Sequence, residues 1–288
     1  NHVVVVGGME NMSQTPHYLD GRNGTKFGNI GLLDGITKDG LLDVYSKVPM
    51  GNCAELCAEK YAITRADQDA FAAWSQQKTA AAQAAGFYHD EIVPLEIPQK
   101  RGEAIIFDKD EFARANTTIE TLEKLKPAFK KEGSVTAGNA SGLNDGAAAL
   151  LLANETGVAQ NGFKPLAKIL SAAVAGVAPN IMGIGPVPAS QKALERAGLS
   201  LDQMDVIEIN EAFAAQVLAC SRALGLDDRD PRINPNGGAI SLGHPLGMSG
   251  ARLLLTAARQ LRATNKRYAL VTMCIGVGQG LAIILEKC

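Results

Sequence analysis

The hydrophobic and polar positions in the first half of the chain separate into strand-like, irregular and helical segments. Four consecutive valines at 3–6 end at a Gly-Gly pair, which predicts a buried core strand that leads into a loop. Residues 11–51 are rich in Gly, Asp, Asn and Thr and show little periodicity, so we expect a long irregular excursion with short strands. Thr64 to Asp67 resembles a capping box, and the alanine-rich run up to Gly86 predicts a helix.

The second half of the chain has an alternating strand and helix rhythm. The pattern predicts strands at 168–175, 206–209, 269–274 and 281–286, and helices at 189–197, 212–224 and 249–263. A glycine-rich turn joins the last two strands, so we expect them to form an antiparallel hairpin packed on helices. This rhythm is typical of an α/β fold.

Composition and charge favour a packed globular protein that binds neither nucleic acid nor membranes. Among the 288 residues, 46% are hydrophobic and 20% are charged, values typical of a packed globular protein. The 28 basic and 30 acidic side chains give a formal charge of -2, so no nucleic-acid partner is expected. The longest apolar runs, such as 147–153, are far shorter than the roughly 20 residues of a membrane span. No membrane association is predicted.

The five cysteines point to a reducing compartment, by default the cytosol, because their odd number and spacing do not suit a disulfide framework. Cys53 and Cys57 lie four residues apart, on one face of a helix. No second Cys or His pair follows at the spacing of a zinc site, so we interpret both as structural and expect no metal.

Three segments near the C-terminus combine a reactive or polar side chain with small neighbours: 210–214 with Asn210, 243–245 with His244, and 274–280 with Cys274. Strand ends in α/β folds are where ligand sites collect. From the residues alone, His244 is equally a general base or a structural histidine. Cys274 is either a small buried hydrophobe or a site residue followed by backbone N–H donors for an oxyanion. The Gly-X-Gly-X-Gly run lies between two strands, which disfavours a dinucleotide site.

Together with Gly-Gly-Met-Glu-Asn-Met-Ser at 7–13 and Ala-Ser-Gly-Leu-Asn-Asp-Gly-Ala-Ala at 140–148, these segments resemble the thiolases, most closely the acetyl-CoA acetyltransferases. The related decarboxylating ketosynthases have a histidine where this chain has Cys274. The resemblance implies transfer of an acetyl group between acetyl-CoA molecules to form acetoacetyl-CoA, or the reverse thiolysis. The alternative from a different class is a non-catalytic coenzyme A binding or interaction module.

The resemblance also implies roles for single residues. His244 matches the histidine that activates the nucleophile, Asn210 the asparagine that holds an oxyanion-hole water, Cys274 the acid/base, and Gly276 an oxyanion-hole N–H donor. The residues that match coenzyme A or acyl contacts are Leu41, Met50, Arg114, Phe129, Ser141 and Phe213. Pro49 replaces a histidine found in many short-chain members, which leaves the acyl-chain preference open. No cofactor is implied beyond the coenzyme A thioester substrates.

The implied fold is a five-layer α-β-α-β-α arrangement of two similar halves with an inserted loop domain. We expect residues 1–13 to be a remnant of the N-terminal half, 14–135 the loop domain, 136–163 a return to the N-terminal half and 164–288 the C-terminal half. The nucleophilic cysteine of the family precedes the motif at 7–13. We therefore expect an incomplete N-terminal half, a nucleophile supplied by a separate segment or chain, and little activity of this chain alone.

Assembly and location are further expectations from the resemblance. Family members are dimers or tetramers, and residues 18–38 are the expected counterpart of the segment that holds dimers together. A cytoplasmic protein is expected, with a mitochondrial one as the alternative.

Overall fold

Two separate sheets organise the computed structural model, which describes residues 1–288. The larger sheet has the strand order β7-β10-β9-β8 and the smaller pairs β1 with β6. Their bounds are β1 Val3–Asn11, β6 Asp145–Ala153, β7 Ala167–Gly176, β8 Val206–Ile209, β9 Tyr268–Ile275 and β10 Gln279–Lys287. The predicted C-terminal hairpin is confirmed, because β9 and β10 pair antiparallel. β8 runs parallel to β9, so both strands end at the same edge.

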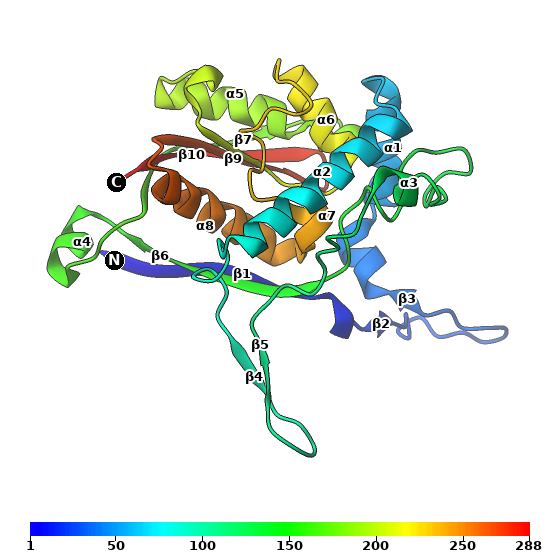
Figure 1. Cartoon of the computed structure of the whole chain (residues 1–288). Coiled ribbons are helices and arrows are strands. Elements are labelled where there is room, and N and C mark those ends of the chain that lie inside the picture. Colours follow the sequence, from blue (N-terminus) through cyan, green and yellow to red (C-terminus); the bar gives the residue numbers. More distant parts are fainter.

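Helices separate and cover these sheets, as Figure 1 shows. α5 (Pro186–Ala197) packs on one face of the larger sheet, and α8 (Leu246–Thr264) packs on β8 and β9 from the other face. α8 also contacts β1 and β6, so it lies between the two sheets. A helix, a sheet, a central helix and a second sheet therefore form four consecutive layers. The outer side chains of β1 and β6 are exposed where the five-layer expectation places a fifth layer.

The predicted helices of the chain form where local signals favour them. α2 (Arg65–Ala84) begins at a complete capping box, in which the Thr64 side chain accepts from the Asp67 N–H and Asp67 accepts from the Thr64 N–H. α5 ends at Gly198, whose φ of 66° is the left-handed conformation that glycine adopts readily. The helix predicted at 212–224 is α6 (Ala214–Ala223), and that at 249–263 lies within α8.

The prediction for the valine run was wrong in two respects. The strand does not end at Gly7 and Gly8 but continues to Asn11, and Val5 is 72% exposed rather than buried. A Cβ on Gly8 would lie 1.9 Å from the Gly247 carbonyl oxygen. The glycine pair therefore lets the strand approach the start of α8 instead of turning the chain.

The expected irregular excursion occupies the region after β1. It holds η1 (Met12–Gln14), the two-residue strands β2 (His17–Tyr18) and β3 (Leu33–Asp34), and the π-helical segment η2 (Ile36–Leu41). Later elements are α1 Met50–Lys60, β4 Leu95–Ile97, β5 Ile105–Phe107, α3 Ile119–Leu122, α4 Glu155–Asn161, η3 Pro179–Ile184, η4 Leu201–Gln203 and α7 Ala239–Leu242. The β4–β5 hairpin projects away from the body (Figure 1).

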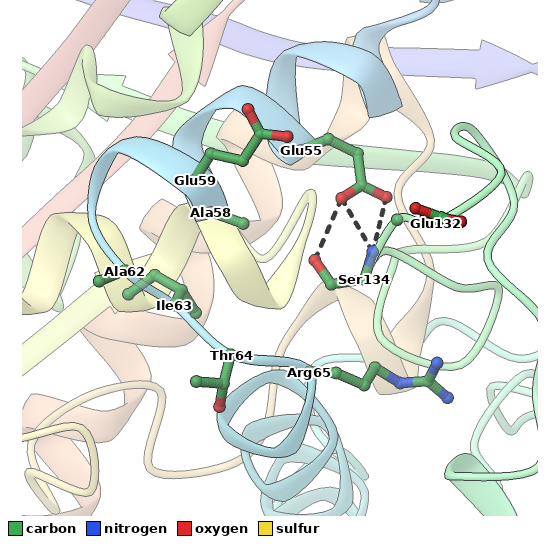
Figure 2. Close-up of a pocket in the computed structure, with 10 residues that line it drawn as sticks. Glu55, Ala58, Glu59, Ala62, Ile63, Thr64, Arg65, Glu132 and Ser134 are labelled. Atoms are coloured by element: carbon green, nitrogen blue, oxygen red, sulfur yellow. Dashed lines mark hydrogen bonds between the residues drawn. The ribbon is translucent and has the colours of Figure 1, made fainter.

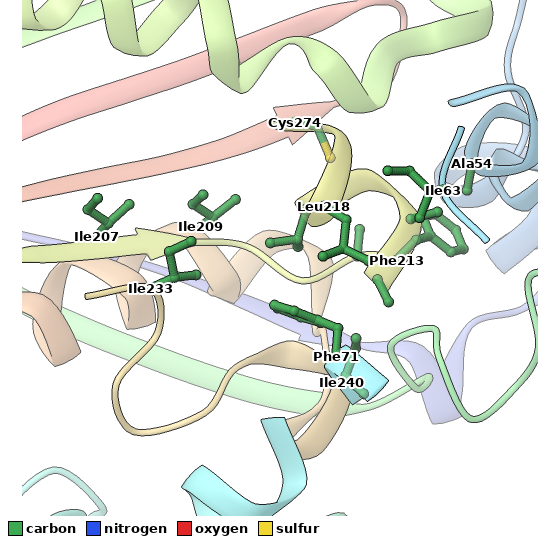
Figure 3. Close-up of a cluster of buried hydrophobic side chains, with 14 of the residues drawn as sticks. Ala54, Ile63, Phe71, Ile207, Ile209, Phe213, Leu218, Ile233, Ile240 and Cys274 are labelled. Atoms are coloured by element: carbon green, nitrogen blue, oxygen red, sulfur yellow. The ribbon is translucent and has the colours of Figure 1, made fainter. Parts of the chain in front are cut away.

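A continuous hydrophobic cluster joins α1, α2 and α6 to the larger sheet (Figure 3). Cys53 and Cys57 on α1 are both fully buried and unpaired, in agreement with their structural interpretation. None of the helices is long and apolar enough to cross a bilayer.

Candidate active site

The sheet edge where β8 and β9 end brings the three predicted segments together. Asn210 directly follows β8, and Cys274 is the penultimate residue of β9. The Asn210 backbone N–H donates to the Thr272 carbonyl at 3.0 Å, which fixes the two strand ends against each other. His244 lies in the short connection between α7 and α8. The site is therefore built from strand ends and a helix start, as expected for this fold class.

His244 is held by hydrogen bonds at both ring nitrogens. Its Nε2 lies 3.1 Å from Asn210 Nδ2, and its Nδ1 lies 2.5 Å from Ser249 Oγ. Burial lowers the pKa of His244 to about 4, and the nearby Arg252 guanidinium contributes in the same direction. The imidazole is therefore neutral at pH 7 and is available as a proton acceptor.

Asn210 keeps an unused hydrogen-bond acceptor beside the imidazole. Its side chain is fully buried, and its amide nitrogen faces His244. The amide oxygen Oδ1 is buried without a partner. A buried acceptor that lacks a donor carries an uncompensated desolvation cost. A bound water, or an N–H or O–H group of a ligand, would remove this cost by donating a hydrogen bond to Oδ1.

The Cys274 side chain belongs to the buried hydrophobic cluster drawn in Figure 3, and its thiol is protonated. Burial raises its pKa to about 12, and the neighbouring Cys57 adds to the shift. Directly after it, the turn 276–278 contains Val277 and Gly278 at positive φ. A Cβ on Gly276 would lie 2.9 Å from the Met50 side chain, so a residue without a side chain fits here best.

One cavity of about 630 Å³ brings most predicted site residues together. Its wall consists of 24 residues, 15 of them hydrophobic, and includes neither lysine nor arginine. Seven of the residues selected from the sequence line it: Leu41, Met50, Ser141, Phe213, His244, Cys274 and Gly276. Asn210 lies behind His244, bonded to its ring. The cavity can therefore hold a largely apolar group next to a base, a thiol and backbone donors.

Two of the predicted coenzyme A contacts do not line this cavity. Phe129 packs edge-to-face on the Phe213 ring, with centroids 6.2 Å apart, and so supports the wall from behind. The Arg114 guanidinium lies 5.6 Å from the Phe112 ring centre and its side chain is exposed. Neither residue is placed against the thiol or the imidazole.

Sequence reasoning missed Ser249 and the Tyr18–Asp39 pair. Ser249 is 1% exposed and contacts the His244 ring, and Tyr18 donates to Asp39 Oδ2 at 2.6 Å in the cavity wall. The position of Ser249 one helical turn after Pro245 is the signal that could have identified it. The Tyr18–Asp39 pair joins two irregular segments, for which no periodicity was available.

A second hollow, of about 490 Å³, lies near α1 and contains none of the predicted site residues. Figure 2 shows Glu55 in its wall, accepting hydrogen bonds from the backbone N–H and the hydroxyl of Ser134. These bonds tie α1 to the segment before Val135, so Glu55 has a structural role there. No group of three or more His, Cys, Asp or Glu side chains is arranged to hold a metal ion.

Family models match almost the whole chain. The thiolase N-terminal domain matches residues 1–156 and the thiolase C-terminal domain matches residues 163–287. These two matches agree with the resemblance found in the motifs.

Relatives of known function are similar over nearly the full chain. A β-ketoadipyl-CoA thiolase of Acinetobacter baylyi is 54% identical over 292 residues, which cover 99% of this chain and 73% of the relative. An acetyl-CoA acetyltransferase of Pseudomonas aeruginosa is 54% identical over 286 residues, which cover 99% of this chain and 72% of the relative. The comparisons give no support to a separate chain that would supply the remaining portion.

Solved structures share the fold. The human mitochondrial 3-ketoacyl-CoA thiolase matches with a TM-score of 0.95 and 47% identity, over 100% of this chain and 72% of that protein. Its complex with CoA matches with a TM-score of 0.94, over 71% of that protein.

Proposed function

The chain belongs to the thiolase family, and from this premise we propose that its cavity performs carbon–carbon bond formation and cleavage on coenzyme A thioesters, with acetyl-CoA and acetoacetyl-CoA as substrates. The observation that carries the proposal is the grouping of a neutral buried imidazole, a protonated thiol and a glycine N–H at one strand edge. A general base and an oxyanion donor near a proton-exchanging thiol are the groups that this reaction needs.

In the synthetic direction, the Cys274 thiol first gives its proton to the coenzyme A thiolate that leaves when the nucleophile is acylated. The resulting Cys274 thiolate removes a proton from the methyl group of a second acetyl-CoA. The carbanion attacks the carbonyl carbon of the acyl thioester, the new carbon–carbon bond forms, and the carbon–sulfur bond breaks to release the nucleophile as a thiolate. Thiolysis reverses these steps, and the Cys274 thiol returns the proton to the carbon. Gly276 lines the same cavity two residues after Cys274, and its N–H can donate to the enolate oxygen that develops during proton transfer.

His244 and Asn210 serve the acyl-transfer step. A neutral imidazole accepts the proton of an attacking thiol and so produces the reactive thiolate. The unpartnered Asn210 Oδ1 can hold a water that donates to the acyl oxygen, together with the N–H that the ring gains when Nε2 takes the thiol proton. Both roles require the ring to stay neutral before the thiol attacks, as its low pKa provides.

We place the acylated nucleophile outside the five cysteines of this chain. Only Cys274 lines the cavity, whereas Cys53, Cys57 and Cys220 are fully buried and Cys288 is the exposed last residue. Burial raises the pKa of both Cys57 and Cys220, which keeps them as poorly nucleophilic thiols.

The cavity wall favours a neutral acyl group. Its carboxylates are Glu10 and Asp39, and no lysine or arginine stands beside them in the wall. An acyl chain that ends in a carboxylate, as in β-ketoadipyl-CoA, would meet like charges and no cation. This charge pattern supports acetyl over dicarboxylic acyl groups.

Thiolysis of acetoacetyl-CoA by added coenzyme A tests the proposal. The assay compares the chain alone with a mixture of two polypeptides. The added polypeptide is the portion of an acetyl-CoA acetyltransferase that this chain does not match. We expect turnover in the mixture, with the acyl group on the added polypeptide in peptide mass mapping. An acyl group on one of the five cysteines would overturn the location of the nucleophile. A folded mixture that binds acetoacetyl-CoA without turnover would favour the alternative, a non-catalytic coenzyme A binding module.

Three predictions from the sequence remain untested. The chain is predicted to form a dimer or tetramer and to be located in the cytoplasm, or alternatively in mitochondria. Its division into four segments is the third prediction. Sedimentation of the purified chain tests the first of these.

A further inference from the structure

The hydrogen bonds around Ser249 determine which nitrogen of His244 carries the proton. Ser249 lies in the first turn of α8 and is 1% exposed. Its hydroxyl donates to the Pro245 carbonyl at 2.9 Å, four residues earlier. A hydroxyl has one proton, so only lone pairs of Ser249 Oγ remain for the His244 ring.

The ring must then donate to Ser249. Nδ1 lies 2.5 Å from Ser249 Oγ, which requires a proton on Nδ1. On the opposite side, the Asn210 amide group donates to Nε2 at 3.1 Å, which requires a lone pair on Nε2. Two independent partners, one from α8 and one from the end of β8, therefore select the same tautomer.

We infer that Ser249 is a positioning residue for catalysis, which fixes His244 as the Nδ1–H tautomer and presents the Nε2 lone pair to the attacking thiol. The chemical meaning of this inference rests on the proposed function, whereas the protonation pattern of the ring does not. When Nε2 takes a proton, the Asn210 N–H loses its acceptor on the ring, whereas Ser249 Oγ continues to accept from Nδ1–H and keeps the imidazolium oriented.

Ser221 offers a matched control for the loss of a buried hydroxyl. It is fully buried in α6 and donates to the Val217 carbonyl at 3.0 Å, also four residues earlier. No histidine contacts it. Ser221→Ala therefore removes the same group and the same type of helix hydrogen bond as Ser249→Ala, but leaves the imidazole untouched.

Two measurements test the inference. Long-range proton–nitrogen NMR of the ¹⁵N-histidine-labelled chain reports the ring tautomer, and the thiolysis assay reports the rate. We expect Nδ1–H in the wild type, a larger share of Nε2–H in Ser249→Ala, and return to Nδ1–H in Ser249→Thr, whose hydroxyl can make the same bonds. The rate should fall about 10- to 100-fold in Ser249→Ala, the usual loss for such supporting residues, and recover in Ser249→Thr.

Several results would contradict this assignment of Ser249. A wild-type ring with the proton on Nε2, or a Ser249→Ala variant with unchanged tautomer and rate, would overturn the inference. An equal loss of rate in Ser221→Ala would show that packing alone is responsible, and would overturn it too. A wild-type ring with Nδ1–H in a folded mixture that does not turn over would refute the proposed function and leave the tautomer assignment standing.

Discussion

At the scale of single residues, burial gives His244 and Cys274 opposite protonation behaviour. Both charged forms are disfavoured in the cavity wall, so the imidazole stays neutral and the thiol stays protonated at pH 7. One group is thereby ready to accept a proton and the other to give one. The thiolase reaction requires both groups, because it activates a thiol in one step and protonates a carbon in another.

Residue types and small neighbours singled out three segments of this site, whereas the resemblance was needed to choose between the structural and catalytic interpretations of His244 and Cys274 and to select Leu41, Met50 and Ser141. His244, Cys274 and Gly276 stand in glycine-containing segments after predicted strands, and these segments do meet in one cavity. Ser249 could not be found in the same way, because its role depends on where the first turn of α8 places its hydroxyl. Arg114 and Phe129 were selected by the resemblance alone, and they lie outside the cavity wall.

Cys274→Ser separates the acid/base role from packing. A hydroxyl has a pKa far above that of a thiol, so it exchanges the α-proton poorly. In the mixture with the added polypeptide, condensation should fall by roughly 100-fold or more, while acylation of the nucleophile on that polypeptide by acetyl-CoA continues. Acyl-enzyme formation is followed by mass spectrometry and condensation by product assay. Cys288→Ser makes the same chemical change at an exposed site and should leave both steps intact. Equal losses in both steps of Cys274→Ser would rule out the assigned role.

The neutral state of His244 makes stability depend on pH. Below the ordinary pKa of 6.5 the unfolded chain binds a proton that the folded chain binds only near pH 4, so unfolding free energy falls as pH drops through this window. Between pH 7 and pH 5 the loss is about 2 kcal/mol. In urea unfolding, His244→Gln should lack this part of the pH dependence. Identical pH profiles of the variant and the wild type would contradict a buried neutral imidazole.

At the scale of elements, the helices and the strands of the larger sheet were predictable, including its edge strands β7 and β8, whereas the exposure of β1 was not. α2 begins at a capping box, α5 and α8 end at residues in the left-handed conformation, and β8 and β9 are rich in apolar and β-branched residues. The valines of β1 have the same composition as a buried strand, yet they belong to a two-stranded sheet with one exposed face. Local composition cannot show which face another layer covers.

The close approach of β1 to α8 leads to a prediction for Gly8. A Cβ at this position would collide with the Gly247 carbonyl oxygen, three residues after His244. Gly8→Ala should therefore destabilise the fold by about 1–3 kcal/mol through overpacking and disturb the His244 hydrogen bonds. Gly31→Ala is the control, because nothing lies within 4 Å of its added Cβ. Equal midpoints of thermal unfolding for the two variants would contradict this packing.

At the scale of the whole molecule, the outer face of the β1–β6 sheet exposes large apolar side chains. Val5 and Leu151 are cross-strand partners, 72% and 51% exposed, and Met9 on the same strand is 69% exposed. Large exposed apolar patches on sheets favour association. The chain has the thiolase fold in four stacked layers. The outer face of its β1–β6 sheet is apolar and carries no covering layer.

We predict that copies of the chain associate through this face. The double variant Val5→Glu with Leu151→Lys places opposite charges at directly paired positions, which keeps the sheet while making its face polar. Sedimentation velocity should show associated species for the wild type and a larger monomer fraction for the double variant. A wild-type monomer at all concentrations would refute the association.

The central claim is that Cys274 exchanges the α-proton of acetyl-CoA bound in this cavity. The most direct test incubates the chain with acetyl-CoA in deuterium oxide and follows deuterium in the acetyl methyl group by mass spectrometry, with binding measured separately by calorimetry. The account predicts incorporation by the wild type and by Cys288→Ser, and a loss of roughly 100-fold or more in Cys274→Ser. Incorporation that Cys274→Ser leaves unchanged, or none at all with acetyl-CoA bound, would contradict it.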